Sequence, residues 1–262
     1  MTAATELQGR HALVTGGARG IGLACVRALA ARGAAVTLLG RNAQTLQEVS
    51  RQLAAEGLAV AAVAADIARP EDVAVAFAQA RAAHGPIQIL VNNAGQAVSE
   101  RFERTSADVW EQMLQVNLSG TFHCTQAALP DMLQGGWGRV INVASTAGLI
   151  GYGYVTAYCA AKHGVVGLTR ALAQEVARKG VTVNAVCPGY TETDIVREAV
   201  GNIMKKTGMD EAAARARLAE RNPQGRLVSA DEVAATVAWL ALPASASVNG
   251  QAIAVDGGEA AA

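Results

Sequence analysis

The fold of this chain is decided by the stretch His11-Ala12-Leu13-Val14-Thr15-Gly16-Gly17-Ala18-Arg19-Gly20-Ile21-Gly22. Residues 11–15 form a short apolar run typical of a buried strand, and residues 23–32 are rich in alanine and leucine, as helices are. Glycines between a strand and a helix let the backbone approach a pyrophosphate, and the helix start offers unpaired N–H groups. The glycine spacing differs from Gly-x-Gly-x-x-Gly, so an ordinary glycine-rich turn is the alternative. The stretch predicts a phosphate-binding turn.

Short apolar runs alternate with helical segments along the whole chain, which predicts an α/β protein with parallel strands and helices on both faces. We expect strands near residues 11–15, 35–39, 59–64, 88–91, 138–144, 181–186 and 251–255. We expect helices near residues 20–32, 42–56, 70–83, 105–133, 155–179 and 229–241. No linker rich in proline, glycine or serine and no internal repeat divides the sequence. Residues 1–262 are therefore predicted to form a single domain.

Composition excludes several classes of function. The formal net charge is zero, and no run of lysine and arginine is long enough to predict binding to nucleic acid or to an anionic membrane. No apolar run reaches the ~20 residues that span a bilayer, and residues 1–6 do not resemble a signal peptide. The four cysteines and four histidines show no metal-ligand spacing, so we expect no metal site. A cytoplasmic location fits these features best.

A tyrosine and a lysine stand four positions apart in the run Tyr158-Cys159-Ala160-Ala161-Lys162. On a helix, these two side chains project from one face, one turn apart. A tyrosine ordinarily titrates near pH ~10, and a nearby ammonium lowers the phenol pKa by favouring the phenolate. Together with the hydroxyl of Ser145, the pair could polarise a carbonyl or deprotonate an alcohol. Taken alone, a pair at this spacing is usually a solvated helix face, so the other motifs decide its interpretation.

The combination of motifs resembles the short-chain dehydrogenase/reductase family, from about residue 8 to residue 258. The motifs are Thr15-Gly-Gly-Ala-Arg-Gly-Ile-Gly22, Asn92-Asn93-Ala94-Gly95, Asn117, Ser145, Tyr158-x-x-x-Lys162, Pro188-Gly189-x-x-x-Thr193 and Asp256-Gly257-Gly258. The resemblance implies a Rossmann-type, doubly wound, seven-stranded parallel sheet. It also implies hydride transfer between a nicotinamide dinucleotide and a carbonyl or secondary alcohol.

The resemblance assigns four catalytic residues. Tyr158 would exchange the proton on the substrate oxygen, and Ser145 would donate a hydrogen bond to that oxygen. Lys162 would lower the pKa of Tyr158 and hold the nicotinamide ribose. Asn117 lies in an apolar helical segment, where it would bend the helix and position a water linking Lys162 to solvent. A buried asparagine with satisfied hydrogen bonds is the alternative.

The resemblance also assigns the residues that bind the dinucleotide. They are Gly16, Ala18, Arg19, Gly20, Ile21 and Gly22 in the glycine turn, Asp66 and Ile67 at the adenine, Asn92, Asn93, Ala94 and Gly95 at the adenosine ribose, Tyr158 and Lys162, and Pro188, Gly189, Thr191 and Thr193 at the nicotinamide. Asp66 is equally explained as a helix cap before Pro70.

The residues at the end of the second predicted strand favour NADP(H) over NAD(H) as the cofactor. A 2′-hydroxyl is commonly bound by an acidic residue at the end of this strand, but the sequence there is Gly40-Arg41-Asn42. Arg41, and Arg19 in the glycine turn, offer guanidinium donors to a 2′-phosphate. NAD(H) remains possible, because either arginine is also explained as a solvated side chain.

The substrate is less well defined. The positions that line the substrate pocket in relatives are occupied here by Ser145, Tyr158, Gln96, Leu149, Tyr152 and Val155. Residues 194–225 correspond to the family's substrate lid. The resemblance favours 3-oxoacyl and 3-hydroxyacyl thioesters, as in 3-oxoacyl-thioester reductases and 3-hydroxyacyl-CoA dehydrogenases. Other ketones and secondary alcohols, including aromatic ones, are the main alternative. A non-catalytic dinucleotide-binding regulator and a nucleotide-sugar epimerase are remote alternatives. Relatives imply a homotetramer.

Overall fold

The sheet is built outward from β1 (His11–Thr15), which is buried along its whole length. In the computed structural model, which describes residues 5–261 without the side chain of residue 195, β1 pairs with β2 (Ala35–Gly40) on one side and with β4 (Ile89–Asn92) on the other. The sheet therefore grows from β1 on both sides, first through β2 and then, after the chain returns to the other side of β1, through β4. In an open α/β sheet this reversal creates a crevice at the carboxyl ends of the strands, where ligands bind.

The sheet has seven strands, and all of its pairs are parallel. The other strands are β3 (Val60–Ala64), β5 (Gly138–Val143), β6 (Val181–Pro188) and β7 (Ala252–Val255). Their order is β3-β2-β1-β4-β5-β6-β7. The predicted single-domain α/β fold with a doubly wound, seven-stranded parallel sheet is confirmed.

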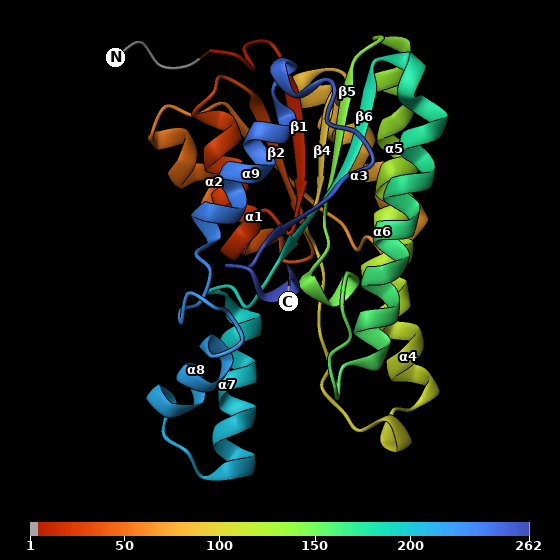
Figure 1. Cartoon of the computed structure of the whole chain (residues 1–262). Helices are drawn as coiled ribbons and strands as arrows, with labels where there is room; N and C mark the ends of the chain where they lie inside the picture. Colours follow the sequence, from red (N-terminus) through yellow and green to blue (C-terminus); the bar gives the residue numbers. More distant parts are fainter. Residues whose placement is uncertain (1–4, 262) are drawn as a thin grey trace.

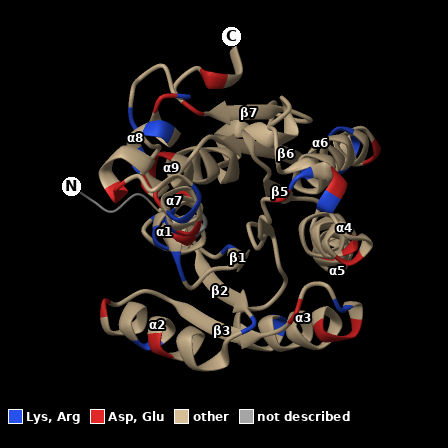
Figure 2. Ribbon diagram, turned by 90° about the horizontal axis from the view of Figure 1, so that it is seen from below, with Lys and Arg blue, Asp and Glu red and all other residues tan. Residues whose placement is uncertain are grey.

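Helices cover both faces of the sheet (Figure 1). They are α1 (Gly20–Ala30), α2 (Ala43–Ala55), α3 (Pro70–His84), α4 (Ala107–Leu114), α5 (Gly120–Gln134), α6 (Thr156–Val176), α7 (Asp194–Thr207), α8 (Glu211–Ala219) and α9 (Ala230–Ala241). Figure 2 shows α1, α2 and α9 on one face and α3, α4, α5 and α6 on the other. Alternate strand residues supply the two cores, so Val14 packs with α1 and α9 while its neighbour Leu13 packs with α3 and α5. No helix among residues 5–261 is long and apolar enough to cross a membrane.

The helix predicted at residues 105–133 is wrong in one respect, because it is not continuous. A π-helical turn over Gln115–Ser119 separates α4 from α5. Asn117, at the centre of this turn, is fully buried and hydrogen-bonded to the backbone of Gln96. Asparagine is a poor helix former, and this tertiary hydrogen bonding supports the wider turn. The departure from a regular α-helix at Asn117 is thus a π-helical turn.

Residues 194–225 form an excursion beyond the carboxyl ends of the strands, visible as α7 and α8 at the bottom of Figure 1. The two helices pack on each other through a small apolar cluster of their own, which contains Val196, Val200, Ala214 and Leu218. The segment therefore contains two helices that support each other.

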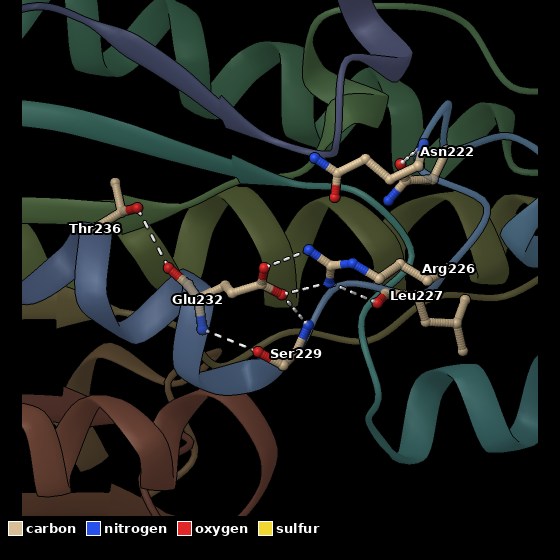
Figure 3. A network of polar contacts seen from close by, with 7 residues as sticks. Asn222, Arg226, Leu227, Ser229, Glu232 and Thr236 are labelled. Atoms are coloured by element: carbon tan, nitrogen blue, oxygen red, sulfur yellow. Dashed lines mark hydrogen bonds and ion pairs between the residues drawn. The ribbon is translucent and has the colours of Figure 1, made fainter.

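The far end of the excursion is fixed to α9. Arg226 forms an ion pair with Glu232 at 2.6 Å, and Glu232 also accepts a hydrogen bond from the backbone N–H of Ser229 (Figure 3). Ser229 in turn caps α9, so the two residues form a capping box. The excursion therefore ends on a rigid element of the fold.

Candidate active site

The glycine turn joins β1 to α1 at the carboxyl edge of the sheet. Gly16 and Gly20 have positive φ angles of 66° and 50°, and a Cβ atom on Gly22 would lie 2.1 Å from the carbonyl oxygen of Gly16. Helix α1 begins without a side-chain cap and without an acidic residue in its first turn. Its first N–H groups therefore keep their positive potential and offer a site for phosphate. The turn fits a dinucleotide pyrophosphate.

The glycine turn is tied to the loop after β4 by the hydroxyl of Thr15. This oxygen accepts hydrogen bonds from the backbone N–H groups of Asn93 at 2.9 Å and Ala94 at 3.0 Å. The side chain of Asn93 donates to the carbonyls of Thr15 at 3.0 Å and Gly16 at 3.3 Å. The sequence analysis quoted Thr15 in a motif but missed its role. A threonine at a strand end before a glycine turn was the available signal.

Asn92 points away from the cleft. Its amide group donates to Thr125 at 3.0 Å and to Asn142 at 2.8 Å, and Asn142 donates to Thr169 at 2.9 Å. These four side chains form a buried polar chain behind the sheet edge. Asn92 is only 5% exposed, so its observed contacts are with the protein interior.

Ser145, Tyr158 and Lys162 meet at the carboxyl end of β5. Ser145 follows this strand, and its hydroxyl lies near enough to the phenol of Tyr158 to act on the pKa of that phenol. Tyr158 and Lys162 come from one face of α6, and the Lys162 Nζ lies 5.6 Å from the centre of the Tyr158 ring. Lys162 also donates to the Val143 carbonyl at 2.9 Å. The sequence prediction that these residues share one site agrees with this geometry.

The expected lowering of the Tyr158 pKa is not what this geometry produces. Burial raises the pKa of Tyr158 to about 12, and the hydrogen bond from Ser145 acts in the opposite direction. Burial likewise lowers the pKa of Lys162 to about 8. Both shifts have the same physical cause, because removing water disfavours the charged form of either group. The spacing of the pair was informative, but burial outweighs the charge effect inferred from it.

Asn117 joins the π-helical turn to the loop that follows β4. Its Oδ1 accepts from the Gln96 N–H at 3.2 Å, and its Nδ2 donates to the Gln96 carbonyl at 2.9 Å. A Cβ atom on Gly95 would lie 2.7 Å from Asn117 Oδ1 and 3.7 Å from Lys162 Nζ. Gly95 therefore lies between Asn117 and Lys162, which places all three on one wall of the cleft.

The residues expected at the adenine follow β3. Asp66 Oδ1 accepts from the Ala68 N–H at 3.0 Å, whereas the N-cap position of α3 is held by Arg69, which makes no side-chain cap hydrogen bond. The helix-cap explanation of Asp66 is therefore wrong, since its carboxylate closes the turn after β3. Ile67 is buried, and its carbonyl accepts a hydrogen bond from His123 at 3.1 Å.

The residues expected at the nicotinamide lie at the end of β6, opposite the glycine turn. Thr191 donates to the Gly189 carbonyl at 3.0 Å, and Thr193 donates to the Thr191 carbonyl at 3.1 Å. A Cβ atom on Gly20 would lie 3.2 Å from the methyl group of Thr193. The loop after β6 therefore lies directly against the start of α1.

The two arginines considered for a 2′-phosphate behave differently. Arg19 forms an ion pair with Asp194, the first residue of α7, at 2.9 Å, although its side chain is 75% exposed. Arg41 is exposed and has no hydrogen bond or ion pair to any of residues 5–261. Asn42 caps α2 by accepting from the Thr45 N–H at 3.0 Å.

The residues expected to bind substrate have distinct surroundings. Leu149 packs beside Val165 and Val166, and the side-chain nitrogen of Gln96 is buried without a partner among residues 5–261. The Tyr152 hydroxyl is hydrogen-bonded to Thr146 and to Glu259, each at 2.7 Å. The phenol of Tyr152 is therefore already engaged within the protein.

Three residues beside Tyr152 escaped the sequence analysis. Tyr190 packs edge-on against the Tyr152 ring, with centroids 6.3 Å apart, and Arg221 lies 4.8 Å above that ring. Glu259, whose side chain is only 6% exposed, also lies 3.9 Å from the Arg221 guanidinium. These residues come from distant parts of the chain, and no local pattern marked them.

The fold and this cleft together define a dinucleotide-dependent oxidoreductase acting on carbonyl or alcohol groups. A family model described as short chain dehydrogenase matches residues 10–203. D-beta-hydroxybutyrate dehydrogenase of Cupriavidus necator is 39% identical over 253 residues, which cover 96% of this chain and 98% of that protein. The 3-oxoacyl-(acyl-carrier-protein) reductase FabG of Escherichia coli K12 is 37% identical over 253 residues, covering 97% and 98%. The chain therefore belongs to the short-chain dehydrogenase family.

Solved structures agree with this placement. A variant of actinorhodin polyketide ketoreductase with NADPH superposes with a TM-score of 0.93 at 36% identity, covering 98% of this chain and 99% of that one. A gluconate 5-dehydrogenase from Burkholderia cenocepacia, in complex with NADP and tartrate, gives a TM-score of 0.91 at 36% identity, covering 99% and 98%.

Burial of Lys162 predicts a pH-dependent contribution to stability. Between the folded pKa of about 8 and the ordinary value of 10.5, the unfolded chain binds a proton that the folded chain does not. The free energy of unfolding contributed by this group therefore rises with pH in this window. We expect the wild-type protein to gain unfolding free energy relative to the Lys162→Met variant, by up to about 1.4 kcal/mol per pH unit above pH 8. Urea denaturation at several pH values measures the difference, and a constant difference would contradict the prediction.

Proposed function

We propose that this enzyme transfers hydride between NADP(H) and a 3-oxoacyl or 3-hydroxyacyl thioester. The observation that carries the proposal is the convergence of Ser145, Tyr158 and Lys162 at the carboxyl end of β5, with the Lys162 Nζ 5.6 Å from the centre of the Tyr158 ring. This group lies at the same edge of the sheet as the glycine turn. Proton donors and a phosphate-binding turn on one edge are what dinucleotide-linked carbonyl reduction requires.

In the proposed mechanism, Tyr158 gives its proton to the carbonyl oxygen during reduction. With a pKa of about 12 the phenol is protonated at neutral pH, which suits the reductive direction. Ser145 donates a hydrogen bond to the same oxygen as negative charge develops on it. Lys162 holds the nicotinamide ribose, and its position near the phenol favours return of the proton. A nicotinamide dinucleotide held by these residues would supply the hydride for reduction or accept it in oxidation.

Asn117 is proposed as a positioning residue. Its two hydrogen bonds to the Gln96 backbone hold the loop that ends one wall of the cleft, next to Lys162. The polar oxygen of Asn117 beside the lysine supports the proposed water that links Lys162 to solvent. Gln96, Leu149 and Tyr152 are proposed to border the substrate, with Tyr152 acting through its ring because its hydroxyl is bonded to Glu259.

The dinucleotide is proposed to lie across the reversal of strand order. Its pyrophosphate would bind the N–H groups at Ala18, Gly20, Ile21 and Gly22, with Arg19 beside it. Its adenosine would lie against Asp66, Ile67, Ala94 and Gly95, and its nicotinamide against Pro188, Gly189, Thr191 and Thr193. Three observations support NADP(H) as this dinucleotide. No acidic residue directly follows β2, the Arg41 guanidinium there makes no hydrogen bond to residues 5–261, and two similar solved structures contain NADPH or NADP.

Residues 194–225 are proposed to act as a substrate lid. Their helices α7 and α8 pack mainly on each other, and α7 reaches the glycine turn through the exposed ion pair between Arg19 and Asp194. Such contacts can open and close at low cost, because exposed ion pairs contribute little stability.

A homotetramer is also proposed. The exposed aromatic side chains of Trp110 on α4 and Phe122 on α5 support a self-association surface there.

The substrate class is tested with a panel of carbonyl compounds. We expect acetoacetyl-CoA and longer 3-oxoacyl thioesters to give the highest kcat/KM, measured by loss of NADPH absorbance. Free 3-oxo acids, sugar acids and aromatic ketones form the comparison set. A higher kcat/KM for any of these would replace the thioester with that substrate class, while leaving the oxidoreductase assignment in place.

Removing the phenol hydroxyl tests the proposed proton donor. We expect Tyr158→Phe to lower kcat by roughly 100- to 10,000-fold, because the general acid is lost, while NADPH binding persists. Tyr154→Phe is the matched control, since Tyr154 lies nearby but is 63% exposed. Steady-state turnover assays measure the loss of kcat, and fluorescence titration with NADPH measures cofactor binding separately. Near-normal turnover in Tyr158→Phe would remove this residue from the mechanism.

Reversing the charge at Arg41 tests the choice of cofactor. We expect Arg41→Asp to raise the KM for NADPH by about tenfold or more, since tenfold corresponds to only about 1.4 kcal/mol, and to improve use of NADH. Arg51→Asp, an exposed arginine on α2, is the matched control for the change of net charge. Wild-type enzyme that already prefers NADH in paired assays would overturn the NADP(H) assignment.

A further inference from the structure

A second cavity lies at the amino end of the sheet, away from the active site. Its volume is about 330 Å³, and it opens between the starts of β5 and β6 and the loop that follows α9. Arg139 is the second residue of β5, whereas Ser145 follows the other end of that strand. Six strand residues span about 20 Å, so the two sites are separate.

Arg139 is buried beside this cavity without a carboxylate. Its side chain is among the largest that are fully buried, with 2% of the residue exposed. Its hydrogen bonds go from Nη1 to the carbonyls of Gly138 at 2.8 Å and Gly180 at 3.4 Å, and from Nε to the carbonyl of Leu242 at 3.4 Å. No acidic side chain among residues 5–261 pairs with it, and its Nη2 makes no hydrogen bond to them. An uncompensated buried charge is costly.

A second cation increases the local positive charge. The indole of Trp137 lies between two guanidinium groups, with Arg10 at 4.0 Å and Arg139 at 4.4 Å from the ring centre. The aromatic faces stabilise both cations, but each contact is worth only about 0.5–2 kcal/mol. Burial and the charge of Arg10 both lower the pKa of Arg139, so an anion would relieve the same cost.

A hydrogen-bond donor stands beside this arginine. Thr182 is directly opposite Arg139 in the β5–β6 register, and its side chain therefore leaves the sheet on the same side. Thr182 is 5% exposed, and its hydroxyl is buried with no partner among residues 5–261. A buried hydroxyl without a hydrogen bond is rare in folded proteins.

We propose that this cavity binds a small organic carboxylate. The carboxylate accepts hydrogen bonds from Arg139 Nη2 and the Thr182 hydroxyl, and the short hydrocarbon body lies against Pro243 and Ala246. One guanidinium edge and one hydroxyl match the two oxygens of a carboxylate, and the apolar walls favour an organic acid over an inorganic anion. Binding links β5, β6 and the loop after α9, and it leaves the active site open.

The fluorescence of Trp137 provides a local readout. The chain has three tryptophans, and the other two, Trp110 and Trp239, are 39% and 45% exposed, so Trp110→Phe with Trp239→Phe leaves Trp137 as the only one. We expect butyrate, titrated at constant ionic strength, to change this emission saturably. Butyramide, which has the same shape but no charge, should give no saturable change.

Substitutions in the cavity complete the test. In the same background, Thr182→Val should raise the dissociation constant for butyrate at least fivefold, and Arg139→Lys should do the same because it removes the Nη2 donor. Thr236→Val is the matched control, since its hydroxyl donates only to the Glu232 carbonyl within α9. The kcat/KM for carbonyl reduction should be unchanged in Thr182→Val, which also shows that this variant is folded.

Three outcomes would overturn the proposal. The first is the absence of saturation at about 100 mM butyrate, a concentration at which half-saturation corresponds to a binding free energy of only about 1.4 kcal/mol. The second is an equal emission change with butyramide. The third is unchanged butyrate binding in Thr182→Val. Because the readout is Trp137 emission, these outcomes do not depend on which substrate the active site reduces.

Discussion

The hydroxyl of Thr15 holds together the two halves of the cleft. It accepts two backbone N–H groups, from Asn93 and Ala94, at the point where the strand order reverses. Thr15 is 1% exposed, and an unsatisfied buried N–H costs about 1–3 kcal/mol, so these hydrogen bonds fix the distance between the ends of β1 and β4. The glycine turn continues from one side of this junction, and the Gly95–Asn117 wall continues from the other. Together with the Asn93 side chain, which donates to the Thr15 and Gly16 carbonyls, this hydroxyl fixes both walls of the cleft.

Burial sets the chemistry at the end of β5. The same loss of water raises the pKa of Tyr158 and lowers that of Lys162, so burial shifts each residue toward its neutral form, although a Lys162 pKa of about 8 still leaves the amine mostly charged at neutral pH. A neutral phenol near the Ser145 hydroxyl is a ready proton donor to a carbonyl oxygen. Proton return in the oxidative direction needs additional stabilisation of the phenolate, and the ammonium of Lys162 is the nearby positive group. The structure thus favours the reductive half of the proposed reaction.

The sequence predicted the sheet to within about two residues at each strand end, because apolar β-branched runs and glycine turns are local signals. It also brought Ser145, Tyr158 and Lys162 to one site. The π-helical turn was not predictable as such, since it depends on a hydrogen bond between Asn117 and Gln96 across the fold. The contact of Tyr152 with Glu259 joins residues 107 positions apart and leaves no periodic signal. The direction of the Tyr158 pKa shift depends on burial, which spacing alone does not give.

The two ends of β5 share a physical feature that links the active site to the second cavity. Lys162 at one end and Arg139 at the other are buried cations that donate to backbone carbonyls and pair with no carboxylate among residues 5–261. Carbonyl groups carry only partial charge, so neither cation is fully compensated within the chain. At Lys162 the deficit fits the proposed mechanism, in which negative charge would develop on the substrate oxygen nearby. The same reasoning applied to Arg139 requires an anion at the amino end of the sheet, and the unpartnered Thr182 hydroxyl marks where that anion binds.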